Sequence, residues 1–242
     1  MGQKRGKRST KGTRTAASSS LSPRKRQERL RRRVKAGILI LAVLTVLFGV
    51  IRVLKPGLLG INQYSERSGD AIDAAKPEID VQLLDVNSYS RPGEESGQIK
   101  GIVIHYTANP GATAKQNRDY FEGLKDSHET RASSHFIVGL DGEIIQCVPT
   151  WEVAYASNNR NSDTVSIECC HPDKSGKFNE ATYRSMVQLT SWLCQKFGLT
   201  QDDVIRHYDI TEKICPKYFV DHPEAWEQFK EDVKTALQNS KK

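Results

Sequence analysis

Three side chains of this sequence are of types that bind transition metals: His105, His207 and Cys215. His207 and Cys215 lie eight residues apart, and His105 follows a short apolar run far upstream. Imidazole nitrogen and thiolate sulfur are common ligands of zinc, and three protein ligands with an open fourth position are typical of catalytic zinc. The spacing alone is weakly specific, because a histidine at a strand end is more often a hydrogen-bonded structural residue.

The pattern of apolar residues indicates the strands that would position these side chains. Residues 101–108 (GIVIHYTA) form a short β-branched run, which predicts a buried strand that carries His105 to a polar rim. Residues 133–148 (SSHFIVGLDGEIIQCV) predict two strands joined by an Asp-Gly turn. Residues 164–170 (TVSIECC) predict a further strand.

Helical periodicity alternates with these strands. Residues 113–125 predict a helix capped near Thr113, and residues 180–197 predict an amphipathic helix with Gly198 just after it. A last helix is expected over residues 223–238. The apolar side of the first helix is expected to hold Tyr120, Phe121 and Leu124. Together these elements predict an α/β fold, with a mixed central β-sheet flanked by helices.

The N-terminal part of the chain has a different composition. Residues 1–35 are rich in Lys and Arg and predict a disordered basic tail. Residues 36–54 are apolar except for Arg52 and predict one transmembrane helix, with flanking charges that reach the membrane interfaces. Residues 55–78 are expected to form a linker, and residues 79–242 the folded domain. A cleaved signal peptide is the alternative, but no small-x-small cleavage site follows closely.

The charge distribution indicates orientation and argues against one class of partner. Residues 1–35 carry 14 basic residues and one acidic residue, whereas the rest of the chain carries 22 basic and 28 acidic residues. The positive-inside rule therefore predicts a cytoplasmic tail and an extracellular domain, held at the cell membrane by a single pass. The acidic globular part argues against nucleic-acid binding by the folded domain, since phosphate contacts need a basic face.

The domain is predicted to be exported and has five cysteines. Because this number is odd, at least one thiol must be free, bound to metal or paired with another chain. With Cys215 assigned to metal, the other four could form one or two disulfides or could be small buried side chains, and the sequence leaves both alternatives open. These four are Cys147, Cys169, Cys170 and Cys194.

Four motifs in order, IVIHYTA, SSHFIV, SIE and RHYDIT-x-K-x-CP, carry a resemblance to a known family. The region from about residue 81 to residue 235 resembles the zinc-dependent N-acetylmuramoyl-L-alanine amidases of phage endolysins and bacterial cell-wall hydrolases. Peptidoglycan recognition proteins share this fold. The resemblance implies a Zn²⁺ cofactor, peptidoglycan as the substrate, and hydrolysis of the amide between N-acetylmuramic acid and L-alanine of the stem peptide.

The resemblance also implies individual roles. The zinc ligands would be His105, His207 and Cys215, with Glu168 and Lys213 as catalytic residues. A carboxylate beside a zinc-bound water can move its proton, and a fixed cation can stabilise the oxyanion of the tetrahedral intermediate. The non-functional alternatives are a surface carboxylate for Glu168 and a solvated charge on a loop for Lys213.

Substrate contact is predicted for His135, Tyr106, Tyr155 and Asn161, and Asn158 is a weaker candidate. A hydrogen-bonded structural histidine remains the alternative for His135. Surface positions are expected for His128, His171 and His222.

Two related functions compete with a membrane-anchored hydrolase. Relatives that have lost the cysteine ligand bind peptidoglycan without cutting it, and the presence of Cys215 favours an enzyme. A released endolysin would have the same chemistry, but the apolar run at 36–54 argues against it.

Overall fold

The computed structural model describes residues 24, 27 and 71–240 of the 242-residue chain. The predicted basic tail at 1–35, apart from two residues, and the predicted membrane helix at 36–54 lie outside this part, as does most of the linker. Within the described part, no helix has the length and apolar character needed to cross a bilayer.

A six-stranded mixed sheet forms the centre of the described domain, in the order β1-β4-β3-β5-β2-β6. Its longest strands, β2 (Gly101–Tyr106) and β5 (Thr164–Cys169), are parallel neighbours. The other strands are β1 (Asp80–Val81), β3 (Phe136–Val138), β4 (Ile144–Gln146) and β6 (Val204–Arg206). Only β3 and β4 pair antiparallel. The Asp-Gly turn joins these two strands, and Gly142 has the positive φ of 84° that such turns favour in glycine.

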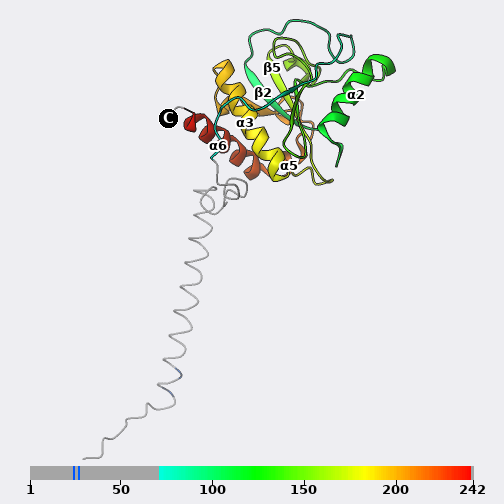
Figure 1. Ribbon diagram of the computed structural model, residues 1–242. Coiled ribbons are helices and arrows are strands. Elements are labelled where there is room, and N and C mark those ends of the chain that lie inside the picture. The colour runs from blue at the N-terminus through cyan, green and yellow to red at the C-terminus, as the bar shows by residue number, and fades with distance from the viewer. Residues whose placement is uncertain (1–23, 25–26, 28–70, 241–242) are drawn as a thin grey trace, which may run out of the picture. The chain divides into compact units, whose positions relative to one another are not determined.

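Two helices pack on one face of the sheet: α3 (Glu180–Phe197) and α6 (Pro223–Asn239) (Figure 1). The alternate residues of β2 that face these helices, Ile102 and Ile104, join Phe136 and Ile167 in the larger hydrophobic core. The amphipathic pattern of α3 explains this packing, since its buried positions recur at helical spacing. Its bounds agree with the prediction, and Gly198 ends it with a φ of 69°.

The other face is covered in part by α2 (Ala114–Ser127), which lies on the opposite side of the sheet in Figure 1. Thr113 caps it in a capping box with Gln116. Phe121 and Leu124 are buried as predicted, whereas Tyr120 is 49% exposed and does not lie on the apolar side. The polar Asn117 is buried instead, where its side chain reaches the Thr113 carbonyl oxygen.

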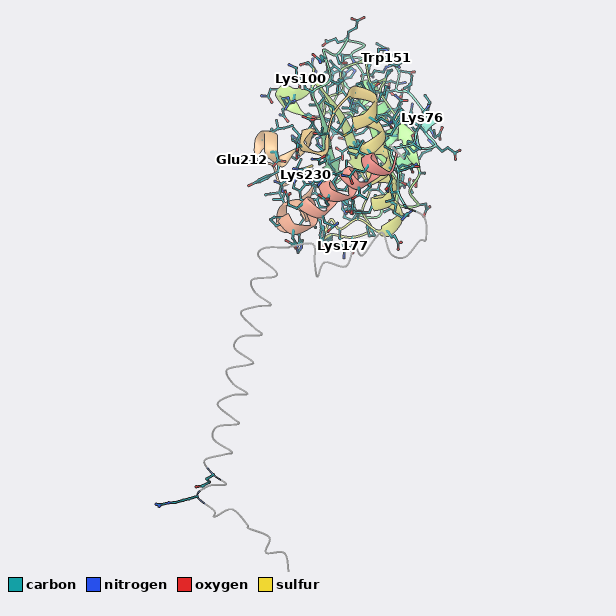
Figure 2. All side chains as sticks on the ribbon, turned by 90° about the vertical axis from the view of Figure 1, so that its left-hand side faces the viewer. Lys76, Lys100, Trp151, Lys177, Glu212 and Lys230 are labelled. Atoms are coloured by element: carbon teal, nitrogen blue, oxygen red, sulfur yellow. The ribbon has the colours of Figure 1, made fainter. Side chains whose placement is uncertain are left out.

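Short helical elements complete the fold. Their bounds are η1 (Asn158–Arg160), η2 (Gln201–Asp203), α4 (Tyr208–Thr211) and α5 (Lys217–Asp221). Large apolar side chains at the surface include Trp151, in the loop that follows β4 (Figure 2). The beginning of the described chain is attached to the end of α6, because the Ala74 amide donates to Ser240 Oγ at 2.6 Å and Asn239 Nδ2 donates to the Ile72 carbonyl oxygen. Packing against the core therefore begins at Ile72, before the predicted boundary at residue 79.

All five cysteines lie in the described part and are free and buried. Cys169 and Cys194 belong to the larger core cluster, and Cys147 and Cys170 to the smaller one. This arrangement favours the second alternative, in which these four cysteines act as small apolar side chains.

Candidate metal centre

Adjacent parallel strands bring two of the three predicted ligands together. His105 lies near the end of β2, and His207 directly follows β6, which pairs with β2. The carboxyl ends of parallel strands meet at one edge of a sheet. The His207 amide donates to the Ile104 carbonyl oxygen at 3.3 Å, which fixes the start of α4 beside β2.

A loop after α4 returns the third ligand to the same place. The Tyr208 amide donates to the Cys215 carbonyl oxygen at 2.9 Å, and the Cys215 amide donates to the Lys213 carbonyl oxygen at 2.7 Å. These two bonds close the loop, so Cys215 lies against the end of β2 although 110 positions separate it from His105.

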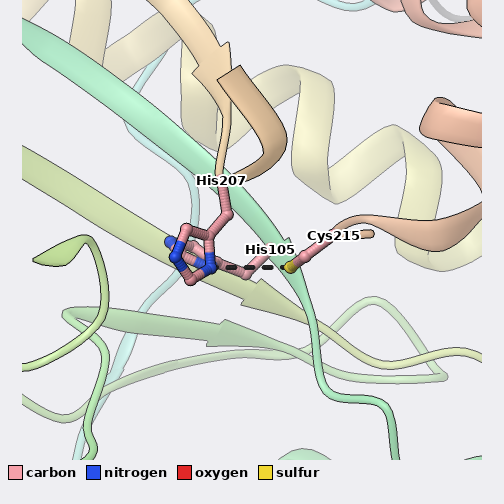
Figure 3. A group of neighbouring side chains, drawn as sticks. All are labelled: His105, His207 and Cys215. Atoms are coloured by element: carbon pink, nitrogen blue, oxygen red, sulfur yellow. Dashed lines mark hydrogen bonds between the residues drawn. The ribbon is translucent and has the colours of Figure 1, made fainter. Parts of the chain in front are cut away.

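The ligand atoms of His105, His207 and Cys215 lie within 4.8 Å of one another (Figure 3). Cys215 Sγ is 3.8 Å from His105 Nδ1. The three residues are 2%, 6% and 3% exposed in chain order. His207 Nδ1 is buried and has no hydrogen-bond partner. An unpaired buried nitrogen is costly, and a bound cation would satisfy it. The donor set of two imidazoles and one thiol therefore fits a zinc-type ion.

The pKa values of the ligands also fit a cation. Burial, followed by the nearby His207 ring and the Lys213 ammonium, holds the pKa of His105 well below its usual value. Burial and Lys213 likewise lower the pKa of His207. Both rings are therefore neutral and have the lone pairs that metal ligation needs. Burial and Glu168 raise the pKa of the Cys215 thiol to about 12, so metal binding would release its proton.

Glu168 lies beside His105 in the register of β5 and β2, and the two side chains face the same side of the sheet. Glu168 is partly buried, and its Oε2 atom is buried without a hydrogen-bond partner. Burial raises the pKa of this carboxyl to about 8, and the Lys213 cation opposes the shift. A carboxyl group with a pKa near neutrality next to candidate metal ligands is suited to proton transfer.

Lys213 is exposed, on the loop that closes at Cys215. Its positive charge lowers the pKa values of His105, His207 and Glu168. The structure thus brings the five predicted ligand and catalytic residues to one site.

The four predicted substrate contacts are not equivalent. Tyr106 ends β2 beside the ligands, and burial and Cys215 raise the pKa of its hydroxyl. Tyr155 is partly buried, with the Arg131 guanidinium 6.0 Å from its ring centre. Asn161 has an internal role, because its Oδ1 accepts hydrogen bonds from the amides of Ala156 and Ser157.

His135 is not available to a substrate in this structure. It is 1% exposed, and both ring nitrogens are bonded: Nδ1 lies 3.0 Å from Ser166 Oγ and Nε2 lies 2.9 Å from the Glu152 carbonyl oxygen. Burial lowers its pKa to about 4. This geometry favours the structural alternative for His135.

Two histidines are exposed as expected, but the expectation for His171 was wrong. His128 and His222 are at the surface. His171 is buried and stacks on Tyr106 with ring centres 5.1 Å apart, while its Nδ1 contacts the Asp173 carbonyl oxygen. No sequence pattern indicates this position, because His171 follows the predicted strand and precedes a proline, where neither strand nor helix periodicity applies.

The outer nitrogens of the two ligand histidines contact consecutive residues. His105 Nε2 lies 3.4 Å from Ser157 Oγ, and His207 Nε2 lies 2.8 Å from Asn158 Oδ1. No sequence pattern indicates Ser157, and Asn158 was predicted only as a weak candidate for substrate contact. Neither residue lies in a motif of the predicted strands, so only the folded geometry identifies these contacts.

The sequence is similar to those of known amidases. The sequence model of the N-acetylmuramoyl-L-alanine amidase family matches residues 95–218. The N-acetylmuramoyl-L-alanine amidase CwlL of Bacillus licheniformis is 36% identical over 170 residues, which cover 65% of this chain and 47% of that protein. The amidase BlyA of Bacillus subtilis (strain 168) is 35% identical over 175 residues, which cover 64% of this chain and 46% of that protein. The chain thus spans about half the length of these relatives.

Solved structures show the same fold. The catalytic domain of XlyA is 26% identical with a TM-score of 0.56, and the alignment covers 65% of this chain and 99% of that chain. PlyL is 24% identical with a TM-score of 0.58, and the alignment covers 66% of this chain and 99% of that chain. The described domain therefore corresponds to nearly the whole of each of these chains.

Proposed function

This chain belongs to the N-acetylmuramoyl-L-alanine amidase family, and on that premise we propose that it hydrolyses the amide between the lactyl group of N-acetylmuramic acid and L-alanine in peptidoglycan. The observation that carries the proposal is the convergence of His105, His207 and Cys215, with the Glu168 carboxyl group on the neighbouring strand. Such a set provides both a metal site and a group that can transfer a proton.

The ion proposed for this site is zinc, held by His105, His207 and Cys215. Two imidazoles and one thiolate are a ligand set that zinc accepts, and a fourth position stays open for water. Zinc, when bound, would supply a water with a pKa of about 7.

Glu168 is the proposed proton carrier. Its carboxylate would take a proton from the attacking water and pass it to the nitrogen of the leaving L-alanine. A cation at the nearby ligand atoms favours the charged carboxylate, which opposes the effect of burial that raises its pKa to about 8.

Lys213 is the proposed oxyanion stabiliser. Attack on the lactyl carbonyl places negative charge on its oxygen, and a fixed ammonium group close to that oxygen lowers the energy of the transition state. The exposed position of Lys213 leaves its cation accessible to a substrate.

A non-catalytic peptidoglycan-binding module of the same fold is the second candidate. Such a module has no need of a buried carboxyl group facing the ligand atoms. The position of Glu168 Oε2, buried without a partner beside His105, therefore favours the hydrolase.

Mass spectrometry of purified peptidoglycan after incubation with the full chain tests the reaction. Free muramic lactyl carboxyl groups and new L-alanine amino termini are expected in equal amounts. Cys215→Ser should lose zinc and activity, because a neutral hydroxyl replaces a charged soft ligand. Cys194→Ser is the matched control, since Cys194 is also buried but lies in α3 and is not one of the three candidate ligands. Peptidoglycan that binds the chain but stays intact would identify a binding module.

The proposed location is the outer side of the cell membrane, with residues 36–54 as a single-pass anchor. The excess of basic residues before this run supports that orientation. Peptidoglycan lies outside the cytoplasmic membrane, so the same orientation brings the domain to its proposed substrate.

A further inference from the structure

The loop between β4 and β5 contacts both candidate histidine ligands from outside the metal position. Ser157 Oγ lies 3.4 Å from His105 Nε2, and Asn158 Oδ1 lies 2.8 Å from His207 Nε2. The nitrogens that remain are His105 Nδ1, which is 3.8 Å from Cys215 Sγ, and His207 Nδ1, which is buried without a partner. Two consecutive residues therefore bind the outer nitrogens and leave the inner nitrogens to the cation.

The chemistry of the Asn158 contact fixes a tautomer. An amide oxygen only accepts hydrogen bonds, so His207 Nε2 must carry the proton that it donates. His207 Nδ1 then has a free lone pair, as a metal ligand requires. The Ser157 hydroxyl can donate or accept, and it accepts from His105 Nε2 once His105 Nδ1 is a ligand.

The backbone of this loop is built to hold these contacts. Asn158 has a φ of 54°, in the left-handed region that asparagine tolerates better than most residues. Asn161 stabilises the turn, because its Oδ1 accepts from the Ser157 amide and its own amide donates to the Asn158 carbonyl oxygen at 3.2 Å. The side chain predicted to contact substrate, Asn161, instead supports the two residues that contact the histidines.

The two contacts differ in their exposure to solvent. Ser157 is 1% exposed, so water cannot replace its hydroxyl, and His105 Nε2 would lose its partner without it. Asn158 is exposed, and water can replace its amide oxygen in part.

We propose that Ser157 and Asn158 are positioning residues for the metal centre, which set the tautomer and ring orientation of His105 and His207. This inference rests on the proposed function, since it presumes that the site binds zinc. Outer partners of this kind typically contribute 10–100-fold, as an order of magnitude, to metal affinity.

The test measures zinc affinity of the full chain by competition with a chromogenic chelator, together with the absorption spectrum of the cobalt-substituted protein. Asn158→Gly keeps the left-handed backbone and removes the amide, and should weaken zinc binding roughly tenfold and alter the cobalt bands. Asn158→Asp keeps an acceptor at the same place and should stay within about threefold of wild type, as conservative rescue. Ser157→Ala should weaken binding by roughly 10–100-fold.

Asn159→Gly is the matched control, because Asn159 lies on the same turn, is exposed and is the immediate neighbour of Asn158. It should retain wild-type affinity and spectrum. Wild-type zinc affinity in Asn158→Gly and Ser157→Ala would overturn the inference while leaving the proposed function intact. So would an Asn158→Gly protein that keeps its zinc but has a raised KM, because Asn158 would then contact substrate. A wild-type chain that binds no zinc would overturn the metal centre and this inference together.

Discussion

At the scale of single residues, the site combines a partly buried carboxyl group, Glu168, with an exposed cation, Lys213. Glu168 has its Oε2 atom buried without a hydrogen-bond partner, and the positive charge of the exposed Lys213 lowers the pKa of this carboxyl group. Desolvation favours the neutral acid, whereas the cation favours the carboxylate. The balance between these two effects sets the proton affinity of Glu168, and each side chain can be removed separately.

Replacing Glu168 with Gln should separate chemistry from metal binding. Gln has nearly the same size but cannot take a proton, so we expect zinc to remain bound and the hydrolysis rate to fall on the order of 10²–10⁴-fold. Zinc content and turnover of peptidoglycan fragments measure the two effects. Glu212→Gln serves as the control, since Glu212 is an exposed acid on the same loop as Lys213 (Figure 2). An unchanged rate in Glu168→Gln would remove Glu168 from the reaction.

Replacing Lys213 with Ala should lower the rate on the order of 10²–10³-fold, as for loss of one oxyanion donor, with zinc retained. Lys213→Arg keeps a cation with a different shape and should recover part of the rate. Steady-state kinetics on a soluble muramyl peptide measure kcat and KM separately. A rise in KM alone, with kcat preserved, would assign Lys213 to substrate binding instead of oxyanion stabilisation.

At the scale of elements, the parallel pairs β5-β2-β6 place His105, Glu168 and the start of α4 at one edge of the sheet. The loop from β4 to β5 contacts this edge through Ser157 and Asn158. His135 links the loop to the sheet. The Nδ1 atom of His135 contacts Ser166 on β5, and its Nε2 atom contacts the Glu152 carbonyl oxygen in the loop. The same loop carries Ser157 and Asn158, which contact the two candidate histidine ligands.

The buried His135 should make stability depend on pH. Above about pH 6.5 this histidine is neutral in the folded and unfolded chains. Below that pH the unfolded chain takes up a proton that the folded protein, with a pKa of about 4, does not take up. The free energy of unfolding should therefore fall between pH 6.5 and 4, by up to about 1.4 kcal/mol per pH unit from this group.

Urea unfolding of the zinc-free protein at several pH values measures this dependence. His135→Gln should show a shallower decline than wild type, by about the contribution of one proton. His222→Gln, at an exposed position, should keep the wild-type decline. Equal slopes in wild type and His135→Gln would mean that the folded protein protonates this ring as readily as the unfolded chain does.

Element length and local turn signals decided which elements could be predicted from the sequence. The long periodic helix at 180–197 and the apolar run that forms β2 have strong patterns, and both were predicted. The short elements β6 and α4, which flank His207, have too few residues for a period to emerge and were missed. The equally short β3 and β4 were predicted because an Asp-Gly turn lies between them. Tyr120 was misplaced because the buried side of α2 includes a polar residue, Asn117, whose hydrogen bond satisfies it there.

The residues of the candidate site could be predicted only where they lie in recognisable motifs. His105, His207, Cys215, Glu168 and Lys213 were predicted because they lie in motifs that resemble a family. Their outer partners depend on where the loop from β4 to β5 folds over the sheet. No local sequence pattern specifies the path of this loop. The contact of Ser157 with His105 and the burial of His171 therefore become visible only in the folded structure.

At the scale of the whole molecule, the uneven distribution of charge along the chain predicts its membrane topology. The chain carries 14 basic residues in its first 35 and a net acidic remainder. We expect residues 1–35 inside the cell, residues 36–54 in the membrane and the domain outside.

Protease added to intact protoplasts, with a different tag on each end, measures this topology. The C-terminal tag should be digested and the N-terminal tag should survive with the membrane fraction. A protected C-terminal tag would place the domain in the cytoplasm. A soluble product that begins after residue 55 would show a cleaved signal peptide instead.

The separation of the ligands along the chain affects how the enzyme would mature. His105 and Cys215 are 110 positions apart, and β6, which carries His207 to the site, pairs with β2 only after most of the domain has been synthesised. Contacts of such long range form late, because closing a long loop costs entropy before the contact is made. A nascent chain that ends before β6 therefore has only His105 of the three candidate ligands, and one ligand is too few to retain the ion. Metal uptake would then follow the pairing of β6 with β2, and the proposed activity would appear only after Cys215 has joined the two histidines.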